Sequence, residues 1–258
     1  MTLYMKYLAI HLKSQMQYKV SFTLNAVGQF LIAFSVFISV FFMFSRFGSV
    51  ADFTYNQVLL CFAIVLMAFA ISECFFRGFD TFPSTISNGE FDRIMVRPRG
   101  IVFQVLASKI DLSRIGRLVQ AVVVLIYAIP TSGVVWSPLK VITLVLMLLG
   151  GIAVFSSLFV VYAALCFFTI EGLEFMNIFT DGGREFGTYP LSIYGKEILK
   201  FFTFVVPLAL FQYFPLLYLL GRTDNLLCMF APLFSLLFSL PAYLLWRLGV
   251  KRYTSTGS

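Results

Sequence analysis

Few side chains in this 258-residue chain could carry out catalysis. The single histidine, His11, lies near the N-terminus, which argues against a histidine-pair metal site or a Ser-His-Asp triad, and we interpret it as an interfacial polar residue. The Gly195-Lys196 pair is followed by Glu197 and lacks a phosphate-binding glycine loop, so we do not expect the chain to hydrolyse ATP. The four cysteines show neither metal nor disulfide spacing and are interpreted as small packing residues: Cys61, Cys74, Cys166 and Cys228.

The most chemically varied segment is residues 86–100, ISNGEFDRIMVRPRG, which we call the charged loop. Within it, Asn88 and Gly89 break the chain, and Pro98 stops any helix that begins after them. A short helix carrying both charge signs and a few apolar residues is predicted between these breaks. Such an element suits docking to a soluble protein, whereas the alternative is an ordinary solvated loop whose arginines set membrane topology.

The elements that position this loop follow from composition. Hydrophobic residues make up 60% of the chain, charged residues only 12%, and the mean hydropathy is +0.91. A soluble domain has about 25% charged residues, so these values predict an integral membrane protein with an all-α fold.

Six apolar stretches are long enough for helices that cross a hydrocarbon core of about 30 Å. They are predicted as spans of one domain, residues 1–258, without repeats or a soluble-domain linker. The spans lie near 22–44, 57–76, 118–136, 141–168, 201–221 and 226–246.

Basic residues gather at both termini and in the connector between the second and third spans. The positive-inside rule therefore predicts that both termini and the 80–100 segment are cytosolic. The net charge of +7 needs no nucleic acid partner, because basic residues that flank spans also meet anionic lipid. The first span begins at Ser21, is too long for a signal peptide, and is expected to be retained.

The first 20 residues are predicted as an amphipathic helix at the cytosolic interface. Tyr4, Leu8, Leu12 and Met16 recur at helical spacing, with polar residues on the rest of the helix. Two interpretations stay open: a lever that touches a partner subunit, and a simple interfacial anchor.

Residues 169–200 are too polar for an ordinary span. They hold eight charged side chains around Gly182-Gly183 and Tyr189-Pro190. We expect either a cytosolic linker or a short, kinked fifth helix whose polar groups face protein or a wet cavity. In the second case residues 190–220 would be partly re-entrant, with breaks at Pro207 and Pro215.

The interiors of the six predicted spans contain no Asp, Glu, Lys or Arg, which disfavours a carrier coupled to protons or sodium. Glu73, near the end of the second span, is the nearest exception. We interpret it as a boundary residue beside Arg77, with a relay role as the alternative.

The chain resembles the six-span permease subunits of bacterial ABC transporters, in the type-2 exporter superfamily. The likeness spans essentially the whole sequence and rests on four places. They are Gln17-Tyr18-Lys19, residues 86–98 (ISNGEFDRIMVRP), residues 189–195 (YPLSIYG) followed by Pro207 and Pro215, and the tail 252–258 (RYTSTGS).

The resemblance implies a fold in which two six-span subunits, identical or homologous, face each other in the bacterial inner membrane. Each docks a cytosolic ATP-binding subunit, which holds the ATP and Mg²⁺ that this chain lacks. It also implies an outer re-entrant or gating hairpin that includes Tyr189, Pro190, Pro207 and Pro215. The coupling element that meets the ATPase would contain Gly89, Glu90, Asp92, Arg93, Arg97 and Pro98.

The sequence thus leads to the expectation of a transport subunit that exports an amphiphilic or hydrophobic compound and is not itself an enzyme. The alternatives are a non-transporting membrane scaffold or assembly factor, and an ATP-independent carrier. An ATP-binding partner that co-purifies with the chain would favour the first hypothesis over both others.

Overall fold

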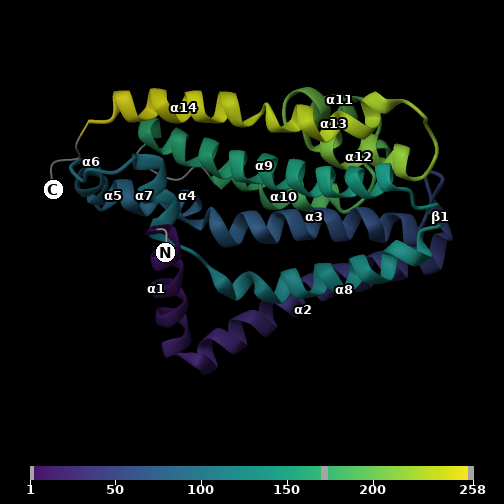
Figure 1. Ribbon diagram of the computed structural model, residues 1–258, viewed down its shortest axis with the longest axis horizontal. Coiled ribbons are helices and arrows are strands. Elements are labelled where there is room, and N and C mark those ends of the chain that lie inside the picture. The colour runs from purple at the N-terminus through teal and green to yellow at the C-terminus, as the bar shows by residue number, and fades with distance from the viewer. Residues whose placement is uncertain (1–2, 170–173, 255–258) are drawn as a thin grey trace.

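The computed structural model describes residues 3–169 and 174–254 as an elongated bundle of helices. Figure 1 shows the long helices lying along the long axis of the molecule. Within these described residues, five helices are long and apolar enough to cross a membrane, and a bent pair makes a sixth candidate. The five are α2 (Lys19–Phe47), α3 (Tyr55–Phe75), α8 (Ile115–Thr131) with the preceding turn η1 (Leu112–Arg114), α9 (Pro138–Thr169), and α13 (Leu226–Leu236) continued by α14 (Ser239–Arg252).

Helix α3 is the centre of the bundle. Its sequence, YNQVLLCFAIVLMAFAISECF, is apolar on all sides, which is typical of a helix that is enclosed by others. Every residue from Val58 to Ala70 is buried, and α3 packs against α8 on one side and α9 on the other. This helix therefore links the two halves of the bundle.

Helix α2 lies at the edge and leaves most of its apolar surface open, as expected for a helix that faces lipid. It packs along α8, and a Cβ atom on Gly116 would lie 2.0 Å from the carbonyl oxygen of Ala26. Only glycine allows that approach of the two backbones. The predicted span 118–136 ends later than α8, because Ser132 and Gly133 end the helix.

A group of short helices caps one end of the bundle, which we call the basic end. Figure 1 places these helices and both labelled chain ends at its left. The predicted short helix of the charged loop is present there as α6. The group consists of α4 (Arg77–Asp80), α5 (Phe82–Ser87), α6 (Glu90–Met95) and α7 (Ile101–Ser108).

Helix α1 (Leu3–Gln17) lies across the bundle at the same end and meets α2 at an elbow at Tyr18. Of the predicted apolar stripe, Leu12 and Met16 are exposed. The side that contacts protein carries Tyr4 and Tyr7 against Phe103, and also His11 and Gln15. Polar and aromatic groups, rather than the aliphatic stripe, dock α1.

The stretch predicted as the fifth span, 201–221, is not one straight helix. It is divided between α11 (Lys196–Phe204) and α12 (Leu208–Leu219), which bend by 113°. Pro207 lies at the break, where it lacks the N–H that a continuous helix needs. Pro215, by contrast, lies inside α12 without ending it.

Short pieces precede the bent pair and connect it to α9. They are η2 (Glu174–Ile178), α10 (Asp181–Gly187) and η3 (Leu191–Tyr194). Residues 170–173, with the Glu171 of the predicted polar stretch, and residues 255–258 of the tail lie outside the described residues.

The far end of the bundle is closed by a two-residue hairpin of β1 (Ser49–Val50) and β2 (Phe53–Thr54). The Arg222 guanidinium, from the turn before α13, lies 4.0 Å from the centre of the Phe53 ring and donates to the carbonyl oxygen of Asp52. This contact ties two loops that are far apart in the sequence.

Candidate functional site at the basic end

The charged loop presents α6 with one apolar side inward and its charges outward. Gly89 precedes the helix with a φ of 68°, a left-handed conformation that glycine adopts without a Cβ clash. Phe91 is fully buried, whereas Asp92 is half-buried. The other predicted coupling residues, Glu90, Arg93, Arg97 and Pro98, are exposed.

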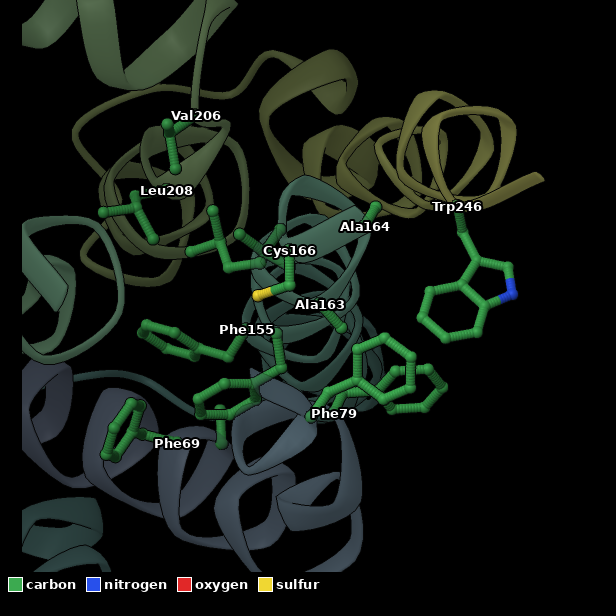
Figure 2. Packing of buried hydrophobic residues seen from close by; sticks show 14 of the residues in the cluster. Phe69, Phe79, Phe155, Ala163, Ala164, Cys166, Val206, Leu208 and Trp246 are labelled. Carbon is green, nitrogen blue, oxygen red and sulfur yellow. The ribbon is translucent and has the colours of Figure 1, made fainter. Parts of the chain in front are cut away.

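Phe91 inserts into a cluster of aromatic rings at the basic end, made by Phe79, Phe82, Phe91, Phe167, Trp246 and Tyr253. Its ring centre lies 5.0 Å from that of Phe167 in α9 and 4.8 Å from that of Tyr253, which follows α14. Figure 2 shows Trp246 of α14 on one side of α9 and Phe69 of α3 on the other. Edge-to-face pairs of this kind add to the free energy gained by burial. Helix α6 is thus fastened to α9 and to the chain after α14.

The segment after α6 is held by one amide side chain. The Nε2 atom of Gln104 in α7 donates to the carbonyl oxygens of Ile94, at 3.0 Å, and Arg99, at 2.9 Å. Since α1 packs on Phe103 of the same helix, the charged loop, α7 and α1 form one connected unit.

A buried charge network lies directly behind this unit. Glu73 is only 5% exposed, and its carboxylate accepts from Arg117 at 2.7 Å and pairs with Arg114 at 3.1 Å and Arg77 at 3.6 Å. Glu73 belongs to α3 and Arg117 to α8. Glu73 lies in the last turn of α3 beside Arg77, as predicted, and Arg117 lies in the first turn of α8, so the interiors of the predicted spans stay uncharged. The pairing of Glu73 with Arg114 and Arg117 was not predicted.

Two further carboxylates complete the network outside the spans. Asp80 pairs with Arg77, but burial outweighs that charge and raises the pKa of the Asp80 carboxyl. Burial also tends to raise the pKa of the Asp111 carboxyl. Hydrogen bonds from Ser113 and the charge of Arg114 outweigh it, so the pKa of that carboxyl is lowered. The Asp111 carboxylate is accordingly charged near neutral pH.

A second polar group lies deeper in the bundle, on α10. A Cβ atom on Gly187 would lie 3.0 Å from Val65, the middle residue of α3, and the Arg184 guanidinium lies 5.1 Å from the centre of the Phe69 ring. Arg184 pairs with both neighbouring carboxylates, Asp181 and Glu185. Charged side chains therefore lie beside the middle of the central helix.

Helix α10 is fixed to α12 by Gln212, which is fully buried. Its Nε2 donates to the carbonyl oxygens of Gly187, at 3.2 Å, and Tyr189, at 2.7 Å. The Cys61 thiol of α3 also donates to the Gly187 carbonyl, at 3.4 Å. The irregular backbone is thus supplied with buried hydrogen bonds, as backbone at membrane depth requires.

The predicted site residues fall into two groups. The coupling residues lie together on and after α6, at the basic end. The proposed gating residues, Tyr189, Pro190, Pro207 and Pro215, lie in the broken stretch farther along the bundle, and all three prolines are buried. Sequence reasoning missed the contacts of Phe91, Gln104 and Arg117, because each joins segments whose pairing no local pattern encodes.

The part of the chain that the structure describes holds no group of three His, Cys, Asp or Glu side chains that could bind a metal ion. Neither a curated protein nor a solved structure matches the chain. A family model does match it: the one described as ABC-2 family transporter protein covers residues 30–257, from within α2 to the C-terminal tail. An all-helical membrane protein with these spans and this match belongs to the ABC-2 family of transporter membrane proteins.

Proposed function

We propose that this chain is the permease subunit of an ATP-driven exporter and moves an amphiphilic or hydrophobic compound outward across the bacterial inner membrane. A separate cytosolic ATPase subunit docks on the charged loop, and the assembly holds two ATPase subunits and two permeases. The observation that carries this proposal is the division of α6 into an exposed charged side and a buried anchor, Phe91.

The orientation follows from charge. The basic end carries the terminal lysines and the arginines of the charged loop. Arg46, Lys140 and Arg222 lie toward the far end, and so does α11, which holds Lys196 and Lys200. By the positive-inside rule the basic end, with both termini, faces the cytosol.

The mechanism needs a mechanical connection rather than a charge relay. When ATP closes the ATPase dimer, the charged loop moves with it, and Phe91 passes the displacement to Phe167 in α9 and Tyr253 after α14. The access state of the spans then depends on which arrangement the nucleotide state stabilises.

The substrate path follows α10. The side chains of Asp181 and Glu185 are 58% and 48% exposed although the helix lies beside the middle of α3. Placing charged groups at that depth in contact with lipid costs free energy. They therefore face a water-filled space that this permease shares with the second one.

The test replaces Glu90, Asp92 and Arg93 together with Ala. The variant is expected to insert and fold, because none of the three is buried, but to lose ATPase binding and transport-coupled ATP hydrolysis. Pull-down and ATPase assays with the cognate subunit measure both.

The matched control is the double variant E197A/K200A, which removes an exposed ion pair from α11 and leaves α6 intact. It is expected to behave like the wild type. Unchanged binding by the triple variant would rule out the charged loop as the docking site, and no co-purifying ATPase at all would favour a scaffold or an independent carrier.

A further inference from the structure

Helix α1 is held away from α2 by polar contacts with the segment before α8. His11 Nε2 donates to the carbonyl oxygen of Ala107 at 3.0 Å, and Gln15 Nε2 donates to that of Ile110 at 2.6 Å. The backbone N–H of Leu112 donates in turn to Gln15 Oε1 at 3.1 Å. Below these contacts, inside the elbow at Tyr18, lies an open pocket of about 550 Å³, which we call the elbow pocket.

The lining of the elbow pocket is rich in hydrogen-bonding groups. The Oε1 atom of Gln29 is buried there without a partner. The neutral polar side chains of the lining include Ser14, Gln15, Ser21, Asn25, Gln29 and Ser113.

The charge of the lining is positive on balance. The Asp111 carboxylate accepts hydrogen bonds from Ser113 and pairs with Arg114 Nε at 3.0 Å. The charges of Asp111 and Arg114 therefore largely cancel. Lys109 is exposed and forms no ion pair with a described carboxylate, although its charge acts on Asp80 at longer range. The Lys109 ammonium thus remains available to an anion.

An apolar surface continues from the pocket along α2. A second hollow of about 700 Å³ shares Tyr18, Ser21 and Asn25 with the elbow pocket and also includes Val20 and Leu24. From there an exposed stripe at helical spacing runs along the span: Val20, Leu24, Val27 and Leu31, at 75%, 66%, 48% and 57% exposure.

We propose that the elbow pocket binds the phosphate-bearing head group of a glycerophospholipid from the leaflet at the basic end. The phosphate lies against Lys109 and accepts hydrogen bonds from Ser21 and Asn25, while the acyl chains lie on the α2 stripe. Basic pockets between helices at the membrane interface are suited to anionic head groups. The site needs only the pocket and the bilayer, so its test does not depend on the proposed transport.

The experiment titrates the purified full-length protein in detergent with dioctanoyl phosphatidylglycerol and measures bound lipid by native mass spectrometry. Lys109→Gln is expected to weaken binding about fivefold, since one lysine near a membrane surface contributes roughly 1 kcal/mol. Lys13→Gln is the matched control, because Lys13 is exposed on α1 at the same end but does not line the pocket, and it is expected to leave the affinity unchanged. Equal losses in both variants would overturn the proposal.

Two further titrations test whether the pocket binds a phospholipid or a free phosphate compound. Glycerol 3-phosphate, which lacks the chains, and dioctanoylglycerol, which lacks the phosphate, are each expected to bind at least about tenfold more weakly than the lipid. Binding of glycerol 3-phosphate as tight as that of the lipid would overturn the lipid assignment.

Asn25→Leu tests the pocket without removing a charge. Asn25 is exposed on α2, so the variant is expected to keep the thermal stability of the wild type while losing lipid affinity. If a stable N25L protein bound the lipid as well as the wild type, the head group would not lie in the elbow pocket.

Discussion

At the residue scale, the contact between Glu73 and Arg117 has a large energetic consequence. Their side chains are 7% and 8% exposed, and together with Arg114 and Arg77 they surround one carboxylate with three guanidinium groups. Removing one member of such a buried pair leaves an uncompensated charge, which typically costs about 3–5 kcal/mol.

We therefore expect Arg117→Gln to lower the free energy of unfolding by about 3 kcal/mol, near the bottom of that range because Arg114 and Arg77 still neutralise Glu73. Glu73→Gln should cost more, since it leaves three arginines without that carboxylate. Denaturant unfolding in detergent micelles measures both changes.

The double variant E73Q/R117Q provides the decisive comparison, and its cost is expected to be well below the sum of the two single costs. Arg99→Gln, an exposed arginine of the charged loop, serves as the control with little expected change. Additive single costs would show that the pair is not coupled.

The roles of some of these residues could be predicted from the sequence, and those of others could not. The break at Gly89 was predictable, because Asn-Gly before a short charged run is a local signal, and Gly89 indeed takes a positive φ. The partner of Glu73 could not be predicted, because Arg117 lies 44 positions away and was expected just outside a span. A lone glutamate in an apolar helix of 21 residues is itself a signal for a buried cation, and that signal could have pointed to the arginines before the next span.

At the scale of elements, α6 acts as a lever only if it is fastened to the helices behind it. Phe91 provides that fastening, with ring centres 5.5 Å from Phe82, 5.0 Å from Phe167 and 4.8 Å from Tyr253. Truncating a buried phenylalanine typically costs about 3–5 kcal/mol.

Phe91→Ala is accordingly expected to loosen α6 while leaving Glu90, Asp92 and Arg93 on its outer side. The proposed ATPase would still bind, but transport per ATP hydrolysed would fall at least about tenfold. Transport and ATPase assays on reconstituted complexes measure the ratio. Met95→Ala changes an exposed side chain of the same helix and should keep both activities. An F91A complex with normal coupling would contradict the proposal that α6 transmits movement through Phe91.

Five of the spans were readable from the sequence because each has a long run of apolar residues that suffices for its burial in lipid. The broken stretch from η2 to α12 could not be predicted from the sequence, for a physical reason. Its polar residues, including Asp181, Arg184 and Glu185, depend on packing against α3 and on Gln212 from α12, which are tertiary contacts. Hydropathy scores each segment alone and misses such compensation.

At the scale of the whole molecule, the exposed carboxylates of α10 and the exposed aliphatic side chains of α14 require different surroundings. Glu185 lies near the middle of the bundle and is 48% exposed. Leu244 on α14 is 58% exposed and suits lipid. In the proposed transporter the first side faces water and the second faces lipid.

In a variant without the four native cysteines, Glu185→Cys is expected to react at least about tenfold faster with a water-soluble maleimide than Leu244→Cys, since thiolate chemistry requires water. The measurement uses the assembled complex in membrane vesicles, with the denatured protein as the reference for full reactivity. Equal protection of both positions would place the α10 side against protein or lipid instead of a wet space.

The docking of α1 also bears on how the chain is made. His11 bonds to a carbonyl 96 positions later, and Gln15 to a backbone segment about as far along. At a synthesis rate of about 5–20 residues per second, these acceptors emerge from the ribosome roughly 5–20 s after α1 does. During that interval the first span can already be inserted while α1 lies on the membrane surface with no site to occupy. Docking of α1 is therefore a late step in biogenesis, timed by translation of the segment before α8.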